Sequence, residues 1–153
     1  MRVNDFETHM HTAISEAKKA LSHSDVPIGA IITDERSKLV SVGHNLKKAK
    51  NNSLCHAEIM ALSAACKQLN SCYLIGCSIF VTLEPCAMCA GAIVNSRISN
   101  LIFGAFDLKA GACGSLMNIT DDPRLNHQIK VTRGVLESEC ASLLTDFFSE
   151  KRH

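Results

Sequence analysis

The sequence has no long apolar segment and contains little proline or glycine. No uninterrupted apolar run approaches the roughly 20 residues of a membrane-spanning helix, and the start, Met1 to Asp5, lacks the apolar core of a secretory signal. With Pro 3, Gly 8, 46% hydrophobic and 20% charged residues, the composition is not that of a disordered or fibrous protein. We therefore expect a cytoplasmic protein without membrane contacts, folded as one domain over residues 1–153.

An excess of one charge sign is also missing. The formal net charge is +1, whereas a surface that binds nucleic acid normally carries a clear excess of Lys and Arg. Local clusters would have to supply such a surface. The candidates are Lys47, Lys48 and Lys50, then Lys109, and finally Lys151 with Arg152. Each of these, taken alone, is typical of an ordinary solvated surface.

Cysteine is abundant, with 8 residues. Without a secretory signal, the reducing cytosol favours thiols, metal ligands and small buried hydrophobes over disulfides. Four cysteines lie in apolar or helical surroundings and are expected to be structural: Cys66, Cys72, Cys77 and Cys140.

The pattern of apolar residues predicts helices alternating with strands. A helical repeat runs from Phe6 to Leu21, and Asn4 with Glu7 resembles a capping box at its start. Strands are predicted at 26–33, 39–43, 78–83, 98–103 and 129–132, and further helices at 57–69, 85–95 and 137–148. Proline is favoured in a first helical turn, so Pro85 is expected to open the helix at 85–95. The order predicts an α/β fold with one mixed sheet covered by helices.

The residues that indicate a catalytic metal site lie at two predicted helix starts. Cys86 and Cys89 lie three residues apart, so both thiols can reach one metal ion, and the first turn of a helix favours the thiolate that binds zinc. His56 supplies a third ligand from the other helix start. Three protein ligands leave the fourth tetrahedral position of zinc open, which is typical of a catalytic site. Cys55 and Cys113 are alternatives for a fourth ligand that would close it.

Glu58 follows the histidine ligand by two residues and is the candidate proton carrier. Zinc lowers the pKa of bound water to about 7, so a nucleophile exists at neutral pH. An adjacent carboxyl group can take a proton from that water, pass it to a ring nitrogen and later help to protonate departing ammonia. Taken alone, Glu58 would be an ordinary glutamate favoured by the helix dipole.

The sequence resembles the bacterial tRNA-specific adenosine deaminases of the cytidine and deoxycytidylate deaminase superfamily over nearly its whole length. H-x-E followed by P-C-x-x-C is the zinc-deaminase signature. The resemblance rests on His44-Asn45, on the segments 56–62, 82–92 and 103–118, and on Asn126-His127. It implies a three-layer α/β/α cytidine-deaminase-like fold with a central mixed five-stranded sheet. It also implies one Zn²⁺ per chain, a homodimer, and conversion of adenosine to inosine at the wobble position of a tRNA anticodon stem-loop.

The same resemblance implies substrate contacts. Asn45 matches the residue that contacts the base, Pro27 and Ile28 match part of the pocket wall, and Asp107 and Lys109 match a loop on the substrate side. Phe148 matches an aromatic residue beside the flipped anticodon nucleotides, where stacking suits single-stranded loops; its neighbour Phe147 is expected in the core. The chain departs from the family pattern at Leu54-Cys55, at Phe106 and in its short tail after Arg152.

Two other functions fit parts of this pattern. The first is a free-base or free-nucleoside deaminase acting on guanine, cytosine or cytidine, which shares the zinc core and is mildly favoured by Cys55-His56. The second is a non-catalytic, zinc-stabilised partner subunit, which would need Glu58 replaced or a fourth ligand present. The segment 103–127 and the Phe pair favour the enzyme that acts on RNA.

Overall fold

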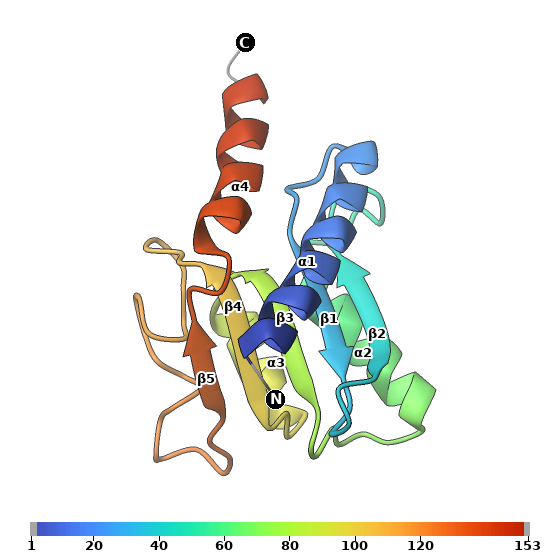
Figure 1. Cartoon of the computed structure of the whole chain (residues 1–153), viewed down its shortest axis with the longest axis vertical. Helices are drawn as coiled ribbons and strands as arrows, with labels where there is room; N and C mark the ends of the chain where they lie inside the picture. Colours follow the sequence, from blue (N-terminus) through green and yellow to red (C-terminus); the bar gives the residue numbers. More distant parts are fainter. Residues whose placement is uncertain (1–2, 152–153) are drawn as a thin grey trace.

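The computed structural model describes residues 3–151 as a five-stranded sheet with helices on both faces (Figure 1). The helices are α1 (Val3–Lys19), α2 (Ala57–Leu69), α3 (Ala87–Asn95) and α4 (Glu137–Lys151), with a 3₁₀ turn at Ala20–His23 after α1. The strands are β1 (Gly29–Thr33), β2 (Leu39–His44), β3 (Ser78–Leu83), β4 (Asn100–Ala105) and β5 (Lys130–Arg133), in spatial order β2-β1-β3-β4-β5. Strand β1 runs antiparallel to β2 and β3, whereas β3, β4 and β5 are parallel. The predicted mixed sheet is confirmed.

Alternation along the central strands builds two apolar cores. Ile31, Phe80 and Ile102 pack with α1 and with Cys140 of α4 on one face. Their neighbours in the same strands pack with α2 and α3 on the other face: Ala30, Ile32, Ile79, Val81, Leu101 and Phe103. Because successive side chains of a strand point to opposite faces, strands that are apolar throughout must be covered on both sides. The three-layer α/β/α arrangement follows from this pattern.

Two predicted helix starts are wrong in detail. Helix α1 already includes Val3, so Asn4 is a helical residue and does not precede the helix as its cap. Helix α3 begins at Ala87 with Cys86 as its N-cap, so Pro85 lies just outside. The extended backbone of Cys86 (φ −75°, ψ 178°) keeps the chain out of the helix for one residue beyond the proline. Within residues 3–151, no helix is long and apolar enough to cross a membrane.

Glycine allows the helices to lie close to the sheet next to the candidate site. A Cβ on Gly43 would lie 2.5 Å from the carbonyl oxygen of Ala57, and one on Gly29 would lie 2.1 Å from that of Ala13. Neither position tolerates a side chain without a shift of a helix. Helix α2 therefore begins directly on the end of β2.

Candidate metal and catalytic site

The predicted metal ligands lie at the starts of α2 and α3. His56 is the N-cap of α2, with extended backbone (φ −72°, ψ 154°), and Cys86 is the N-cap of α3. Cys89 lies in the first turn of α3 and is buried. Strands β2 and β3 both run antiparallel to β1, which lies between them, so β2 and β3 end on the same side of the sheet. Helices α2 and α3 follow these two strands, and their starts therefore meet there.

The ligand atoms have the spacing of a tetrahedral zinc site. The Nδ1 atom of His56 lies 3.7 Å from Sγ of Cys86 and 3.5 Å from Sγ of Cys89. Zn–S bonds of 2.3 Å and Zn–N bonds of 2.0–2.1 Å at tetrahedral angles place nitrogen and sulfur about 3.6 Å apart. In the described part of the chain, these three residues form the one such group of His, Cys or carboxylate ligands. Cys55 and Cys113 are both buried, but neither belongs to it.

The charge balance of the three ligands also suits a cation. Hydrogen bonds from the Cys89 thiol and from His56 lower the pKa of Cys86 to about 3. The hydrogen bond to Cys86, together with burial, holds the pKa of Cys89 far above its usual range. The three side chains alone therefore stabilise one thiolate and not two. A divalent cation stabilises the second thiolate, so the donor set fits zinc.

Glu58 lies in the first turn of α2 and is 4% exposed. Burial raises the pKa of Glu58 to about 6, although the charge of His56 and local hydrogen bonds oppose the rise. A carboxyl group whose pKa lies near neutrality can both accept and return a proton during a reaction. Position and proton affinity therefore both suit a proton carrier beside the metal ligands.

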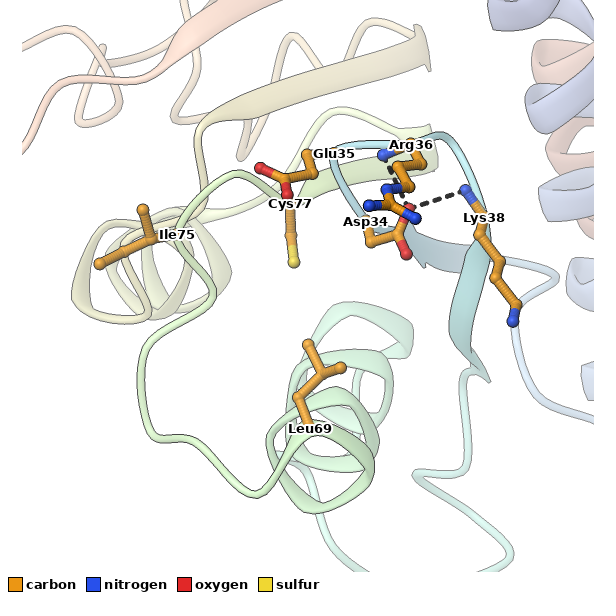
Figure 2. Close-up of a pocket in the computed structure, with 7 residues that line it drawn as sticks. All are labelled: Asp34, Glu35, Arg36, Lys38, Leu69, Ile75 and Cys77. Carbon is orange, nitrogen blue, oxygen red and sulfur yellow. Dashed lines mark hydrogen bonds between the residues drawn. The ribbon is translucent and has the colours of Figure 1, made fainter.

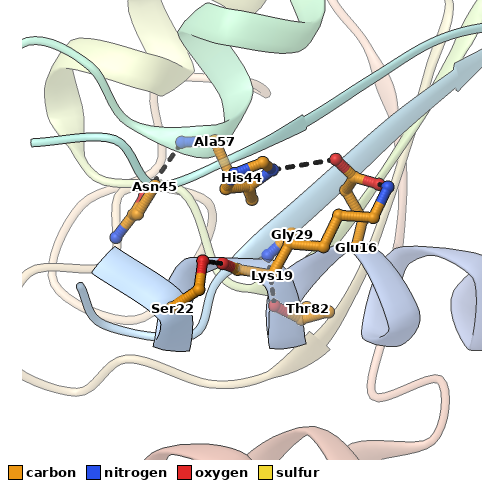
Figure 3. Close-up of polar contacts among 8 residues, drawn as sticks. All are labelled: Glu16, Lys19, Ser22, Gly29, His44, Asn45, Ala57 and Thr82. Atoms are coloured by element: carbon orange, nitrogen blue, oxygen red, sulfur yellow. Dashed lines mark hydrogen bonds and ion pairs between the residues drawn. The ribbon is translucent and has the colours of Figure 1, made fainter. Parts of the chain in front are cut away.

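Asn45 is buried directly after β2, next to the start of α2. Its side-chain oxygen accepts a hydrogen bond of 2.9 Å from the Ala57 N–H, so the amide nitrogen is the group directed elsewhere (Figure 3). The Asn45 N–H donates to the carbonyl of Ile28, and Pro27 beside it is buried. The structure thus brings the predicted base contact together with the predicted pocket wall.

An apolar hollow of about 460 Å³ collects the remaining predicted substrate residues. This volume falls in the range of small-molecule ligand pockets. Its walls come from the segment before β1, the end of β3, the segment after β4 and helix α4: Val26, Leu83, Phe106, Asp107, Leu108, Lys109, Ala110, Leu144 and Phe148. The hollow adjoins the metal ligands, because Gly111, which follows this wall, pairs with Cys86. We call it the β3–α4 hollow.

The two phenylalanines of α4 have different surroundings. Phe148 is 47% exposed at the β3–α4 hollow, whereas Phe147 is 7% exposed. Their rings meet edge to face, with centroids 5.2 Å apart. The expectation that Phe147 belongs to the core is confirmed. The ammonium of Lys151 lies 4.7 Å from the Phe147 ring, while the predicted Arg152 lies outside the described residues.

Sequence reasoning missed two buried carboxylates near the site. Glu84 is 2% exposed and accepts hydrogen bonds from the loop after β4, which includes Asp107. The carboxylate of Glu16 in α1 forms ion pairs with His44 (2.9 Å) and Lys19 (2.9 Å) (Figure 3). His44 directly precedes Asn45 in the chain. Burial opposes ionisation of Glu16, but these two partners lower its pKa below the usual value. Glu84 lies in the segment 82–92 on which the family resemblance rests, yet only the fold reveals its hydrogen-bond partners.

A separate hollow of about 400 Å³ lies at the opposite ends of β1 and β3 (Figure 2). Its lining includes both signs of charge and the buried Cys77. The carboxylate of Asp34 accepts hydrogen bonds from the N–H groups of Arg36 and Lys38 and so closes the β1–β2 turn. None of the predicted site residues lines this hollow, which therefore has no place in the candidate site.

Comparison with known proteins agrees with the geometry. Residues 3–105 match the family model for the zinc-binding region of cytidine and deoxycytidylate deaminases. The chain is 47% identical over 146 residues to a tRNA-specific adenosine deaminase of Bacillus subtilis, covering 95% of this chain and 90% of that protein. It is 44% identical to the tRNA-specific adenosine deaminase of Aquifex aeolicus, covering 96% of each.

Solved structures share the fold. A structure from a study of A-to-I editing by tRNA:A34 deaminases at the wobble position superposes with a TM-score of 0.85 at 37% identity, covering 90% of this chain and 99% of the other. Guanine deaminase from Nitrosomonas europaea superposes with a TM-score of 0.82 at 24% identity, covering 94% of this chain and 84% of the other. The second likeness concerns the fold alone.

Proposed function

This chain belongs to the cytidine and deoxycytidylate deaminase family of zinc enzymes, and on that premise we propose that it deaminates adenosine to inosine at the wobble position of a tRNA anticodon. The substrate is inferred from one observation: the chain is 47% identical, over 95% of its length, to a protein named for that reaction. This similarity extends beyond residues 3–105, where the zinc-binding region ends. It therefore includes the part of the wall of the β3–α4 hollow that follows β4, residues 106–110.

The chemistry divides between the cation and one carboxyl group. Held by His56, Cys86 and Cys89, zinc supplies Lewis-acid activation of the attacking water. Glu58 accepts a proton from that water and delivers it to the purine ring as the new carbon–oxygen bond forms. It then takes the proton of the new hydroxyl group and passes it to the exocyclic nitrogen, so that the carbon–nitrogen bond breaks, ammonia leaves and the ring carbon becomes the carbonyl of inosine. A pKa of about 6 for Glu58 suits both transfers.

The remaining residues orient the base. The amide nitrogen of Asn45 donates to it, a role supported by the hydrogen bond that the side-chain oxygen already accepts from the Ala57 N–H. Pro27 and Ile28 border the same point. Phe148 offers an exposed ring on which a neighbouring anticodon base stacks, and Asp107 with Lys109 contacts ribose or backbone beside it.

The same proposal includes a homodimer in the cytoplasm. Helices α2 and α3 leave an uncovered hollow between them, lined by Ile59, Leu62 and Ala92 among others. A helix as apolar as α3, with an open Gly91 on its surface, is suited to burial against a second copy. Light scattering of the zinc-loaded protein should give about twice the mass of one chain, and cell fractionation should place it with the cytosolic tRNA pool.

The test is an inosine assay on a panel of anticodon stem-loops that carry A34, run beside free adenosine, cytidine and guanine. We expect inosine only at A34. Turnover of a free base or nucleoside at the rate of the best stem-loop would favour a metabolite deaminase. If no substrate in the panel reacts while zinc is bound, the non-catalytic subunit is the better reading.

Glu58→Ala is the control for catalysis. The carboxyl group is a proton carrier and not a ligand, so the variant should keep one zinc per chain and lose deamination. Zinc is measured by elemental analysis of the purified protein. Full activity of the zinc-loaded variant would refute the role given to Glu58.

A further inference from the structure

Glu84 is a buried carboxylate between the metal ligands and the loop that lines the β3–α4 hollow. It directly precedes Pro85 and Cys86 in the chain and is only 2% exposed. Among the described residues, its carboxylate is held by hydrogen bonds and forms no ion pair. An uncompensated buried charge is unfavourable, so these hydrogen bonds must be the reason that the position tolerates glutamate.

The four bonds all come from one loop. Oε1 accepts from the Asp107 N–H (3.2 Å) and from the Ser115 hydroxyl (2.5 Å). Oε2 accepts from the Cys113 N–H (3.1 Å) and from the Ser115 N–H (3.1 Å). We call residues 107–115 the clamped loop, because one side chain binds its first and last residues and one residue between them.

The backbone of the clamped loop also contacts the segment that carries the metal ligand Cys86. Gly111 pairs with Cys86, and the Ala112 N–H donates to the Pro85 carbonyl at 2.8 Å. A Cβ on Gly111 would lie 2.4 Å from the Glu84 carboxylate, so the loop backbone closes directly over the charge. The loop start, with Asp107 and Lys109, lines the hollow.

We propose that Glu84 is a positioning residue that sets the distance between the metal ligands and the substrate wall formed by the clamped loop. The inference rests on the proposed function, since it concerns the same site. Glu84 does not touch substrate. Its carboxylate binds both the Asp107 end and the Ser115 end of the loop, two residues before Cys86 in the chain. The hollow therefore has its shape before the substrate binds.

Glu84→Gln tests the charge with little change of shape. The glutamine oxygen can still accept from the Cys113 and Ser115 N–H groups, while its NH₂ group faces Asp107 and the Ser115 hydroxyl. The Ser115 hydroxyl can rotate and accept a hydrogen bond from this NH₂ group. The Asp107 N–H can only donate, so it loses its acceptor. The substitution should therefore release the loop at Asp107 and leave it held at Cys113.

The expected result is a split between binding and turnover. A hydrogen bond to a charged group is worth about a tenfold change in an equilibrium, so KM for the A34 stem-loop should rise about tenfold while kcat changes by less than about threefold. Amide hydrogen exchange should accelerate about tenfold at Asp107 but not at Cys113. Zinc content should stay at one per chain.

Ser115 provides a milder test if Glu84→Gln does not fold. Ser115→Ala removes only the hydroxyl bond and should raise KM by less than Glu84→Gln, whereas Ser115→Thr keeps the hydroxyl and should restore the wild-type KM. Ser71→Ala is the matched control, because Ser71 also bonds within a loop, to Tyr73, at the other end of the sheet. It should change neither KM nor the exchange at Asp107.

Three outcomes would overturn the proposal. An unchanged KM in folded Glu84→Gln and Ser115→Ala would make Glu84 merely structural, and so would a lower melting temperature without the exchange change at Asp107. Loss of zinc from Glu84→Gln would mean that Glu84 supports the metal ligands and that its effect does not come from holding the loop. Failure of the proposed function is distinguishable: the wild-type protein then forms no inosine in the stem-loop, while the exchange pattern still reports whether Glu84 holds the loop.

Discussion

Replacing Phe148 with alanine separates a binding role of this ring from a structural one. Phe148 is 47% exposed at the β3–α4 hollow, while Phe147 beside it is 7% exposed and part of the core. Alanine removes the exposed ring together with its edge-to-face contact to Phe147, and leaves the buried Phe147 ring in place. The change therefore acts mainly on whatever stacks in the hollow.

The structure sets the size of both effects. Burying a whole phenylalanine side chain contributes about 1.5–3 kcal/mol, so a half-exposed ring should cost about 1 kcal/mol of stability when removed. Stacking of one base on an aromatic ring is worth about 1–3 kcal/mol, which corresponds to a loss of about one to two decades in affinity. The loss of substrate binding should therefore exceed the loss of folding stability.

The assay compares kcat/KM for an A34 stem-loop with that for free adenosine. A free nucleoside has no neighbouring base to stack, so any activity on adenosine should be nearly unchanged in Phe148→Ala. Tyr73→Ala is a matched control, because Tyr73 is a similarly exposed aromatic (51%) outside the candidate site. Equal losses on both substrates, or equal losses in both variants, would show that Phe148 does not bind a base.

Further predictions concern metal binding and the pH dependence of stability. Cys86→Ala should lose zinc and stability together, since a site with two remaining ligands binds metal weakly; full zinc by elemental analysis would require another ligand, with Cys55 and Cys113 the first candidates. The Glu16 pKa is lower in the folded state than its usual value of 4.5, so its contribution is present above that value and lost as the pH falls through the folded pKa. Wild type should therefore lose more stability than Glu16→Gln as the pH falls below 4.5 in urea unfolding, and parallel curves would refute this.

Local sequence signals predicted the elements that pack on the sheet. The run from Ser78 to Leu83 is apolar almost throughout, and a strand covered on both faces is the structure that such a run favours. The helix at Ala57–Leu69 was predicted with the observed bounds. Helix starts were less accurate at Asn4 and Pro85, because cap preferences amount to about 1 kcal/mol and give way to packing and site geometry.

Long-range polar contacts could not be predicted from the same signals. Ser115 lies 31 residues after Glu84, and nothing periodic in the chain marks that pair. The Glu16–His44 pair joins α1 to the end of β2 across 28 residues. Asp107 was expected to contact substrate, yet its carboxylate also accepts hydrogen bonds from Lys109 and Ala110 and so shapes its own turn. That expected contact stays a prediction.

The metal ligands occupy positions that normally stabilise helices. His56 and Cys86 are the N-caps of α2 and α3, and neither side chain caps its helix. Losing a side-chain cap costs about 1 kcal/mol per helix, whereas structural zinc binding contributes about 10–16 kcal/mol in small domains. For α2, the cost is offset further because the side-chain oxygen of Asn45, directly after β2, accepts a hydrogen bond from the Ala57 N–H. A residue proposed to orient the base thus also completes the helix that carries Glu58, so the substrate contact and the proton carrier share one rigid support.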